Sequence, residues 1–194
     1  MSVKKILVSG ANGFIGMALV KELLHRNNDV TCIVRNAKNF KSKDKNVKYI
    51  DFDLKSLNRS IGSYDVVVNC VASLNYNSSW KEISDDNCST LENLILNVDC
   101  GQFINLSSCS VFSEISKIHS QPAPISNYGL SKYVSEKILE FHSGKFDSSL
   151  VIRYPVVIGR NKLTDDFVKY IYMNSINNKD IELYGNGYYY RNVI

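Results

Sequence analysis

The stretch "KKILVSGANGFIGMAL", residues 4–19, decides the fold. Its first part is a short apolar run typical of a buried strand, and apolar residues then recur every three or four positions, as on one face of a helix. Gly10, Gly13 and Gly16 lie where strand and helix meet. In such a loop the first glycine permits a sharp turn, the second lets the backbone approach a pyrophosphate, and the third brings helix and strand together. The sequence therefore predicts a phosphate-binding loop, although the glycines could also serve only a tight turn.

Apolar runs alternate with stretches of helical period along the rest of the chain. We expect strands at residues 29–35, 47–53, 64–72, 101–108 and 149–159, and helices at 84–98 and from 127 onward. Such alternation predicts an α/β protein with a doubly wound parallel sheet, the Rossmann fold. Residues 1–158 would form an NAD(P)-binding domain. Residues 159–194, with a polar helix near 164–177 and a short strand at 181–185, would begin a smaller substrate-binding subdomain that the chain does not complete.

Composition and charge exclude several classes of protein. The chain of 194 residues has a net charge of +4 and no long basic run, so we expect no nucleic-acid and no membrane partner. No apolar run reaches the roughly 18 residues that span a bilayer, and the first residues lack a signal-peptide core, so we expect a cytoplasmic protein. The five cysteines are odd in number and lack metal-ligand spacing, so we expect no metal site and no complete disulfide framework.

The end of the second expected strand bears on the choice of cofactor. An acidic side chain at this place accepts hydrogen bonds from the ribose 2′-hydroxyl of NAD and would repel the 2′-phosphate of NADP. Here the strand ends in Val34, Arg35 and Asn36, with no acid in reach. Arg35 can form paired hydrogen bonds with a phosphate, so NADP is favoured over NAD unless Arg35 is merely solvated. Asp53, after the third strand, is placed to meet an adenine edge or to cap a turn.

The segment "NYGLSKYVSEK", residues 127–137, places Tyr128 and Lys132 on one face of an expected helix. A lysine ammonium near a phenol favours the phenolate, which suits a general acid or base. Ser108 ends the fifth strand and could hydrogen-bond the same substrate oxygen. In a chain with 12 tyrosines the spacing alone carries little weight, and the two could simply share a surface. The order of glycine loop, serine-rich strand end, tyrosine and lysine favours a catalytic group.

In these motifs the chain resembles the extended short-chain dehydrogenases/reductases, also called the NAD-dependent epimerase/dehydratase family of nucleotide-sugar enzymes. The resemblance rests on "GANGFIG" at 10–16, "DFDL" at 51–54, "NCVA" at 69–72, Asn87, "LSSCSVF" at 106–112, "YGLSK" at 128–132, "RYPVVIG" at 153–159 and "YGNGYYYR" at 184–191. It implies a catalytic group of Ser108, Tyr128 and Lys132, and a substrate-binding Arg191 on the sugar-nucleotide diphosphate. With Arg35 added, the expected cofactor contacts are Gly10, Gly13, Phe14, Ile15, Gly16, Arg35, Asp53, Leu54, Ala72, Tyr128 and Lys132.

Departures from the family's pattern bear on the reaction. Dehydratases of the family use an acidic pair directly after the catalytic serine or threonine, where this chain has Cys109 and Ser110, so dehydration is disfavoured. Val156 stands where many epimerases have an asparagine on the diphosphate. The family continues well beyond the motif around Arg191, whereas this sequence stops at Ile194, so we expect a fragment of a longer protein or a shortened product.

Several functions fit these motifs. We favour reduction of a keto group on a nucleotide-linked sugar by NADPH, with Tyr128 as proton donor, because reductases consume NADPH. The rival is a nucleotide-sugar 4-epimerase with bound NAD(P). A reductase of non-sugar carbonyls, which would have no use for Arg191, and a non-catalytic NADP-binding protein are further alternatives. Family members often form a homodimer through the Tyr/Lys helix, and the stripe of Val134, Ile138 and Phe141 suits either such an interface or the core.

Overall fold

The structure is a computed structural model, and it describes residues 2–36, 47–75, 77–113, 121–159 and 167–182. The chain divides into two compact units, Met1–Tyr154 and Pro155–Ile194. In the second unit the structure describes helix α5 (Phe167–Ile176), and the backbone N–H of Glu182 donates to the hydroxyl of Tyr170 at 3.0 Å. The two described residues of the strand expected at 181–185 are not in a strand, and the others lie outside the described residues. The role of this unit in substrate binding stays a prediction.

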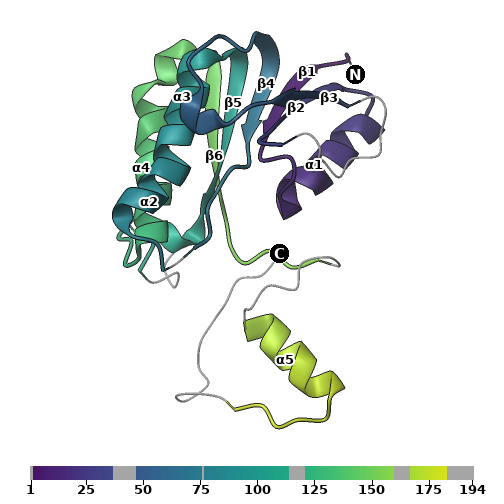
Figure 1. The fold of residues 1–194 in the computed structure, drawn as a ribbon, viewed down its shortest axis with the longest axis vertical. Helices are drawn as coiled ribbons and strands as arrows, with labels where there is room; N and C mark the ends of the chain where they lie inside the picture. Colours follow the sequence, from purple (N-terminus) through teal and green to yellow (C-terminus); the bar gives the residue numbers. More distant parts are fainter. Residues whose placement is uncertain (1, 37–46, 76, 114–120, 160–166, 183–194) are drawn as a thin grey trace. The chain divides into compact units, whose positions relative to one another are not determined.

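Six parallel strands form the sheet of the first unit (Figure 1). They are β1 (Lys5–Ser9), β2 (Asp29–Val34), β3 (Lys48–Asp51), β4 (Ser63–Asn69), β5 (Asp99–Ser108) and β6 (Ser148–Tyr154). Their order is β3-β2-β1-β4-β5-β6, so the chain starts in the middle, runs to one edge and returns to build the other half. This topology confirms the predicted doubly wound sheet. The strand order reverses between β1 and β4, and ligands of such sheets bind at the carboxyl ends of the strands at this point.

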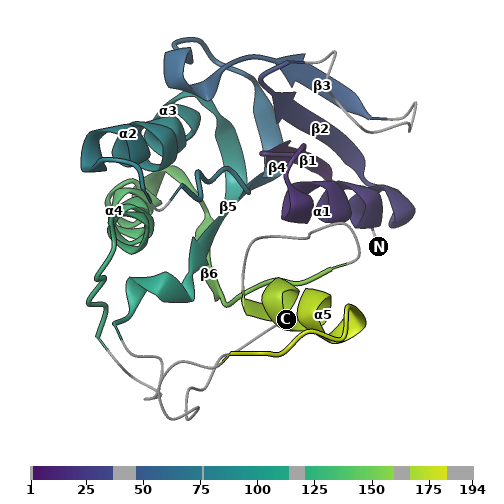
Figure 2. The same ribbon diagram turned by 60° about the horizontal axis from the view of Figure 1, so that its bottom comes forward.

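Helices cover both faces of the sheet (Figure 2). Helix α1 (Phe14–His25) packs on one face, and α2 (Trp80–Ser84), α3 (Thr90–Asn97) and α4 (Asn127–Phe141) lie on the other. Because side chains alternate along a strand, Leu7 belongs to the core under α3 and α4, whereas Ile6 and Val8 belong to the core under α1. Burial on both faces explains the continuous apolar runs from which the strands were predicted.

The helix expected at residues 84–98 differs from the structure. The helical run begins at Trp80, after a capping box between Ser79 and Glu82, and contains a π-helical turn, η3 (Asp85–Ser89), between α2 and α3. A π turn holds an extra residue, which a periodicity of apolar side chains does not reveal, and such turns are frequent at functional sites. The sixth strand also ends earlier than expected, at Tyr154, directly before Pro155, which has no N–H to donate.

A ladder of buried polar side chains crosses the sheet near the carboxyl ends of three strands. Ser9 of β1 donates from Oγ to Oδ1 of Asn69 in β4 at 2.6 Å, and Asn69 donates from Nδ2 to Oδ1 of Asn105 in β5 at 2.9 Å. The three side chains expose at most 2% of their surface. Burying polar groups is costly unless they are hydrogen-bonded, and these two bonds tie the three strand ends together. The Nδ2 of Asn105, which is also buried, has no hydrogen-bond partner among the described residues.

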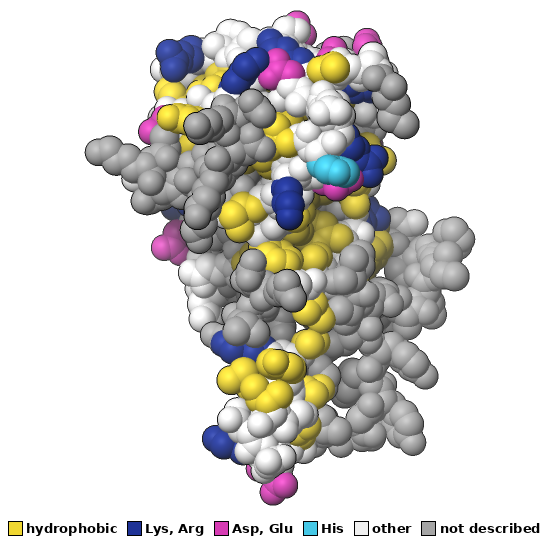
Figure 3. Space-filling model, turned by 90° about the vertical axis from the view of Figure 1, so that its right-hand side faces the viewer, with side chains coloured by type: hydrophobic (Ala, Val, Ile, Leu, Met, Phe, Trp, Pro, Cys, Tyr) yellow, Lys and Arg dark blue, Asp and Glu magenta, His cyan; other side chains and the backbone are white. Residues whose placement is uncertain are grey.

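On the face drawn in Figure 3, lysine and arginine side chains are interspersed with aspartate, glutamate and hydrophobic ones. Among the described helices, none combines the length and the apolar composition that a bilayer crossing requires. All five cysteines are free thiols.

Candidate functional site

The glycine loop has the geometry that its sequence predicts. Gly10 has a φ of +69°, and a Cβ on it would lie 2.7 Å from the carbonyl carbon of Cys70, so only glycine fits there. A Cβ on Gly16 would overlap the carbonyl oxygen of Gly10, so this glycine lets α1 pack against the loop. Gly13 is the N-cap of α1 and has no side chain to cap the helix. A helix start without a side-chain cap suits an anion, because the first backbone N–H groups and the helix dipole point toward it.

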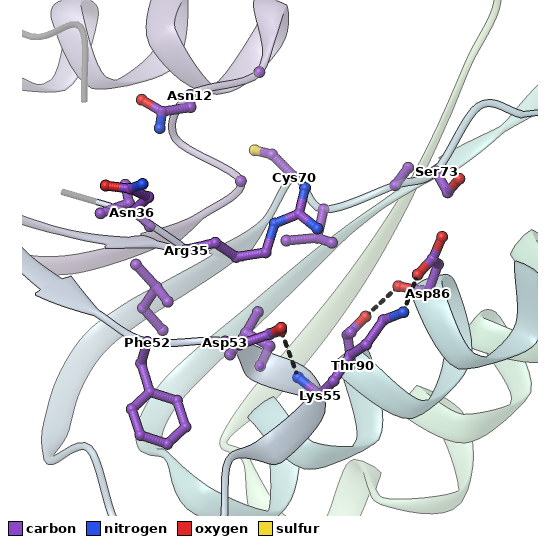
Figure 4. Close-up of a pocket in the computed structure, with 17 residues that line it drawn as sticks. Asn12, Arg35, Asn36, Phe52, Asp53, Lys55, Cys70, Ser73, Asp86 and Thr90 are labelled. Carbon is purple, nitrogen blue, oxygen red and sulfur yellow. Dashed lines mark hydrogen bonds and ion pairs between the residues drawn. The ribbon is translucent and has the colours of Figure 1, made fainter. Parts of the chain in front are cut away.

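A pocket of about 470 Å³ lies at the carboxyl ends of β1, β2 and β4 (Figure 4). Six of the expected cofactor residues line it: Gly10, Gly13, Arg35, Asp53, Leu54 and Ala72. Phe14, Ile15 and Gly16 form the first turn of α1 and are not part of the lining, nor are Tyr128 and Lys132. The volume is within the range of about 300 to 1,000 Å³ that small-molecule and cofactor sites occupy.

Charged side chains stand on two sides of this pocket. Arg35 extends into it from the end of β2, as Figure 4 shows, and Asn36 follows at the same strand end. On the other side the ammonium of Lys55 lies 2.5 Å from Oδ1 of Asp86, and this hydrogen bond raises the pKa of Lys55. Asp53 accepts a hydrogen bond from the backbone N–H of Lys55 at 3.0 Å, so its carboxylate caps a short turn. No sequence pattern indicated the pair of Lys55 and Asp86, because its members are 31 residues apart.

Asn87, in the π turn, connects the pocket wall to α4. Its Oδ1 accepts from the backbone N–H of Ser73 at 2.6 Å, and its Nδ2 donates to Oγ of Ser131 at 2.9 Å. Ser135 donates to the backbone carbonyl of Asn87 at 3.3 Å. Ser73 lines the pocket, and Ser131 directly precedes Lys132. This buried asparagine thus holds the loop after β4 against the helix of Tyr128 and Lys132. The sequence motif includes Asn87 but does not indicate this role.

Helix α4 buries both members of the expected pair. It begins after Ser126, whose Oγ accepts from the N–H of Gly129 at 3.0 Å. Tyr128 is 2% and Lys132 is 1% exposed, and they share the face of α4 that packs on the sheet. Burial lowers the pKa of Lys132 to about 8, against the opposing influence of Cys88, Glu136 and Cys70. Cys70 lines the pocket, and it lies near enough to Lys132 for each group to influence the pKa of the other.

Ser108 lies beside the start of α4. It is the last residue of β5 and is 7% exposed. Its Oγ accepts from the N–H of Ser110 at 3.1 Å and donates to Oγ of Ser110 at 3.2 Å, which closes the short turn η4 (Cys109–Val111). A Cβ on Gly129 would overlap the carbonyl oxygen of Ser110, so α4 approaches this turn as closely as a backbone can. The structure thereby brings Tyr128, the neighbour of Gly129, to the turn that follows Ser108. Arg191 lies outside the described residues.

Comparisons with known proteins identify the family and agree with the fold. A family model described as the NAD dependent epimerase/dehydratase family matches residues 6–194, which confirms the resemblance seen in the motifs. A curated relative, the decarboxylating sterol-4-alpha-carboxylate 3-dehydrogenase of Dictyostelium discoideum, is 27% identical over 190 residues. The match covers 86% of this chain and 57% of the relative, so the chain spans little more than half of that protein's length.

Two solved structures share the fold. One is UDP-glucuronic acid 4-epimerase from Bacillus cereus in complex with UDP-glucuronic acid and NAD, with 23% identity and a TM-score of 0.79 over 97% of this chain and 68% of that one. The other is MoeE5 in complex with UDP-glucuronic acid and NAD, with 25% identity and a TM-score of 0.80 over 97% of this chain and 67% of that one.

Proposed function

Because the chain belongs to the NAD-dependent epimerase/dehydratase family, we propose that it is a nicotinamide-dependent oxidoreductase that acts on a nucleotide-linked sugar. One observation carries the proposal. Tyr128 and Lys132 are buried on one face of α4, next to the turn that follows Ser108 and near the pocket of the glycine loop. A buried lysine is unfavourable for folding, and groups with strongly perturbed pKa values gather at functional sites.

The residues around the pocket fit a dinucleotide. Gly10 leaves no space for a side chain where the loop leaves the sheet, and the uncapped start of α1 suits a pyrophosphate. When bound, the nicotinamide supplies or accepts the hydride. We propose NADPH, because Arg35 and Asn36, rather than a carboxylate, stand at the end of β2. NAD is the alternative, and it is the cofactor held by both solved structures.

Each member of the catalytic group has its own part in the proposal. Tyr128 donates a proton to the substrate oxygen during reduction of a keto group and accepts it in the reverse direction. Lys132 is positively charged below its pKa of about 8, holds the nicotinamide ribose and favours the phenolate of Tyr128. The hydroxyl of Ser108, which donates to Ser110 in this structure, can donate to the substrate oxygen instead.

For the substrate we propose a keto group on a nucleotide-linked sugar. The two solved structures hold UDP-glucuronic acid, and Arg191 occupies the place of a diphosphate-binding arginine in the sequence motif. The curated relative is named for a sterol carboxylate, which keeps a non-sugar substrate as a competing hypothesis. Replacing Arg191 with alanine distinguishes them, since only a diphosphate-bearing substrate loses affinity.

A nucleotide-sugar 4-epimerase is the second candidate. It would use the same group of Ser108, Tyr128 and Lys132, and the structure from Bacillus cereus is that of a 4-epimerase. An epimerase returns the hydride to the other face of the sugar and consumes no cofactor, so the balance of reduced cofactor separates the two candidates.

The test is to incubate the chain with UDP-glucose or UDP-glucuronic acid and NADP⁺ or NAD⁺, and to follow absorbance at 340 nm and the sugar products by chromatography. A reductase run in reverse forms reduced cofactor, and NADP⁺ should be the better oxidant. Tyr128→Phe should abolish this reaction, whereas Tyr133→Phe on the same helix should not. A new UDP-sugar without net reduced cofactor would identify the epimerase. Cofactor binding in calorimetry without any turnover would leave the non-catalytic binding protein.

We further propose that the chain forms a homodimer through α3 and α4. Phe141 is 84% and Leu96 is 52% exposed, and Leu130 and Trp80 are also exposed. Ile138, by contrast, packs against the core. Of the stripe expected on α4, Ile138 therefore serves the core, whereas Phe141 is available for an interface. Light scattering should give twice the mass of 22.0 kDa, and Phe141→Ser should reduce it to that mass.

A further inference from the structure

Glu136 is a buried carboxylate on the same face of α4 as the catalytic group. It lies one helical turn after Lys132 and two turns after Tyr128, and it is 6% exposed. Its Oε1 accepts from Oγ of Ser107 at 2.5 Å and from Nε of Arg153 at 2.9 Å. Its Oε2 accepts from Nη2 of Arg153 at 2.7 Å. Three hydrogen bonds, two of them between opposite charges, thus fix the carboxylate.

The partners of this carboxylate belong to the two strands at the edge of the site. Ser107 directly precedes Ser108 in β5, and Arg153 is its neighbour across the β5–β6 register. The guanidinium of Arg153 also lies 5.0 Å from the centre of the Phe112 ring, which follows the turn after Ser108. The carboxylate of Glu136 therefore joins α4, β5 and β6 at one point, next to Ser108, the expected hydrogen-bond donor to the substrate oxygen.

Among the described residues, three groups act on the charge of Lys132, and one of them is a carboxylate. The groups that act on its charge are the thiols of Cys88 and Cys70 and the carboxylate of Glu136. Burial raises the pKa of the Cys70 thiol to about 12 and also raises that of Cys88, so both thiols are neutral at physiological pH. Of these three groups, Glu136 alone can then balance the positive charge of Lys132.

We propose that Glu136 is a positioning residue of the catalytic group. Its carboxylate holds the helix of Tyr128 and Lys132 against the strand end of Ser108, and it places a negative charge one helical turn from the ammonium of Lys132. The kinetic consequence rests on the function proposed above, whereas the effect on Lys132 can be measured without any substrate.

The substrate-free test follows the titration of Lys132. The difference in free energy of unfolding between the wild type and Lys132→Met varies with pH only where Lys132 binds protons differently in the folded and unfolded chains. The lower end of that pH range marks its folded pKa. In a Glu136→Gln background this end should move down by about 0.5 to 2 pH units. A unit charge at about 6 Å, the usual Cβ spacing of residues one helical turn apart, produces this shift at effective dielectric constants between about 80 and 20.

Matched variants separate charge from geometry and from misfolding. Glu140→Gln removes an exposed carboxylate from the same helix and should leave the titration of Lys132 unchanged. Glu136→Asp keeps the charge but shortens the side chain, so the titration should stay near its wild-type position. Glu136→Gln leaves the guanidinium of Arg153 without its partner and can unfold the chain. The double variant Glu136→Gln/Arg153→Gln removes both charges, so no charge is left without a partner. The titration of Lys132 can then be measured in this variant if Glu136→Gln alone does not fold.

The kinetic readout uses UDP-glucuronic acid and NADP⁺. Glu136→Gln should lower kcat about 10- to 100-fold with little change in KM, because Tyr128 and Ser108 lose their alignment rather than their contacts. The alkaline limb of its pH profile should move down with the titration of Lys132.

An unmoved titration of Lys132 in both Glu136→Gln and the double variant would overturn the proposal, because a merely structural ion pair predicts that result. A shifted titration of Lys132 in a chain that turns over neither UDP-glucose nor UDP-glucuronic acid would support the proposal. It would count against the proposed substrate alone.

Discussion

Replacing the buried Lys132 with methionine should stabilise the protein at neutral pH while it abolishes catalysis. Methionine keeps most of the length and the apolar stem of lysine but brings no charge into the core. Lys132 is 1% exposed, and burial lowers its pKa from 10.5 to about 8. The folded chain therefore holds this proton less tightly than the unfolded chain does.

The size and sign of the effect follow from this shift. Each unit of pKa difference corresponds to about 1.4 kcal/mol, so the shift makes the charged lysine unfavourable for folding by about 3 kcal/mol. This penalty is fully present below pH 8, fades between pH 8 and 10.5, and vanishes above pH 10.5, where both states have lost the proton. The free energy of unfolding of the wild type should therefore approach that of Lys132→Met as the pH rises from 8 to 10.5.

Urea unfolding followed by circular dichroism from pH 7 to 11 measures this difference. Effects of the other titrating groups are common to both proteins and cancel in the comparison. Lys137→Met is the matched control, since this lysine is 55% exposed and pairs with Glu140 on the same helix, and its replacement should produce no such pH-dependent gap. A difference between the wild type and Lys132→Met that stays constant from pH 7 to 11 would refute the reasoning.

Three other predictions concern packing, the polar ladder and the cofactor. Gly129→Ala should destabilise the chain by about 1 to 3 kcal/mol in urea unfolding, because the new methyl group meets the turn after β5. Gly144→Ala is the control, since a Cβ there has no heavy atom within 4 Å, and equal stabilities of the two variants would contradict the close approach at Gly129. Asn69→Ala should lower the free energy of unfolding by about 1 to 3 kcal/mol for each buried partner left unsatisfied, and an unchanged urea midpoint would argue against the ladder. Arg35→Ala should weaken NADPH binding about 10- to 100-fold in calorimetry and leave NADH binding unchanged; equal losses for both would show that Arg35 does not read the 2′-phosphate.

Local patterns were sufficient to predict the sheet and the glycine loop. The apolar runs reflect strands buried on both faces, and the positive φ of Gly10 is a constraint that only glycine meets readily. The same patterns predicted a helix over 84–98 but missed its start at Trp80 and its π turn, which is stabilised by contacts of Asn87 to Ser73 and Ser131. The π turn depends on Ser131 of α4, which lies 44 residues after Asn87 in the chain.

The sequence by itself determined the order of strands and helices, the family, and the places of Ser108, Tyr128 and Lys132 along the chain. Each of these depends on spacing within a short segment, and parallel strands bring their carboxyl ends to one edge. Only the tertiary structure decided which side chains surround those residues. The ion pair of Lys55 with Asp86 and the carboxylate of Glu136 between Ser107 and Arg153 join segments that are distant in sequence. Such contacts arise from the packing of helices on the sheet, which no local pattern of residues encodes.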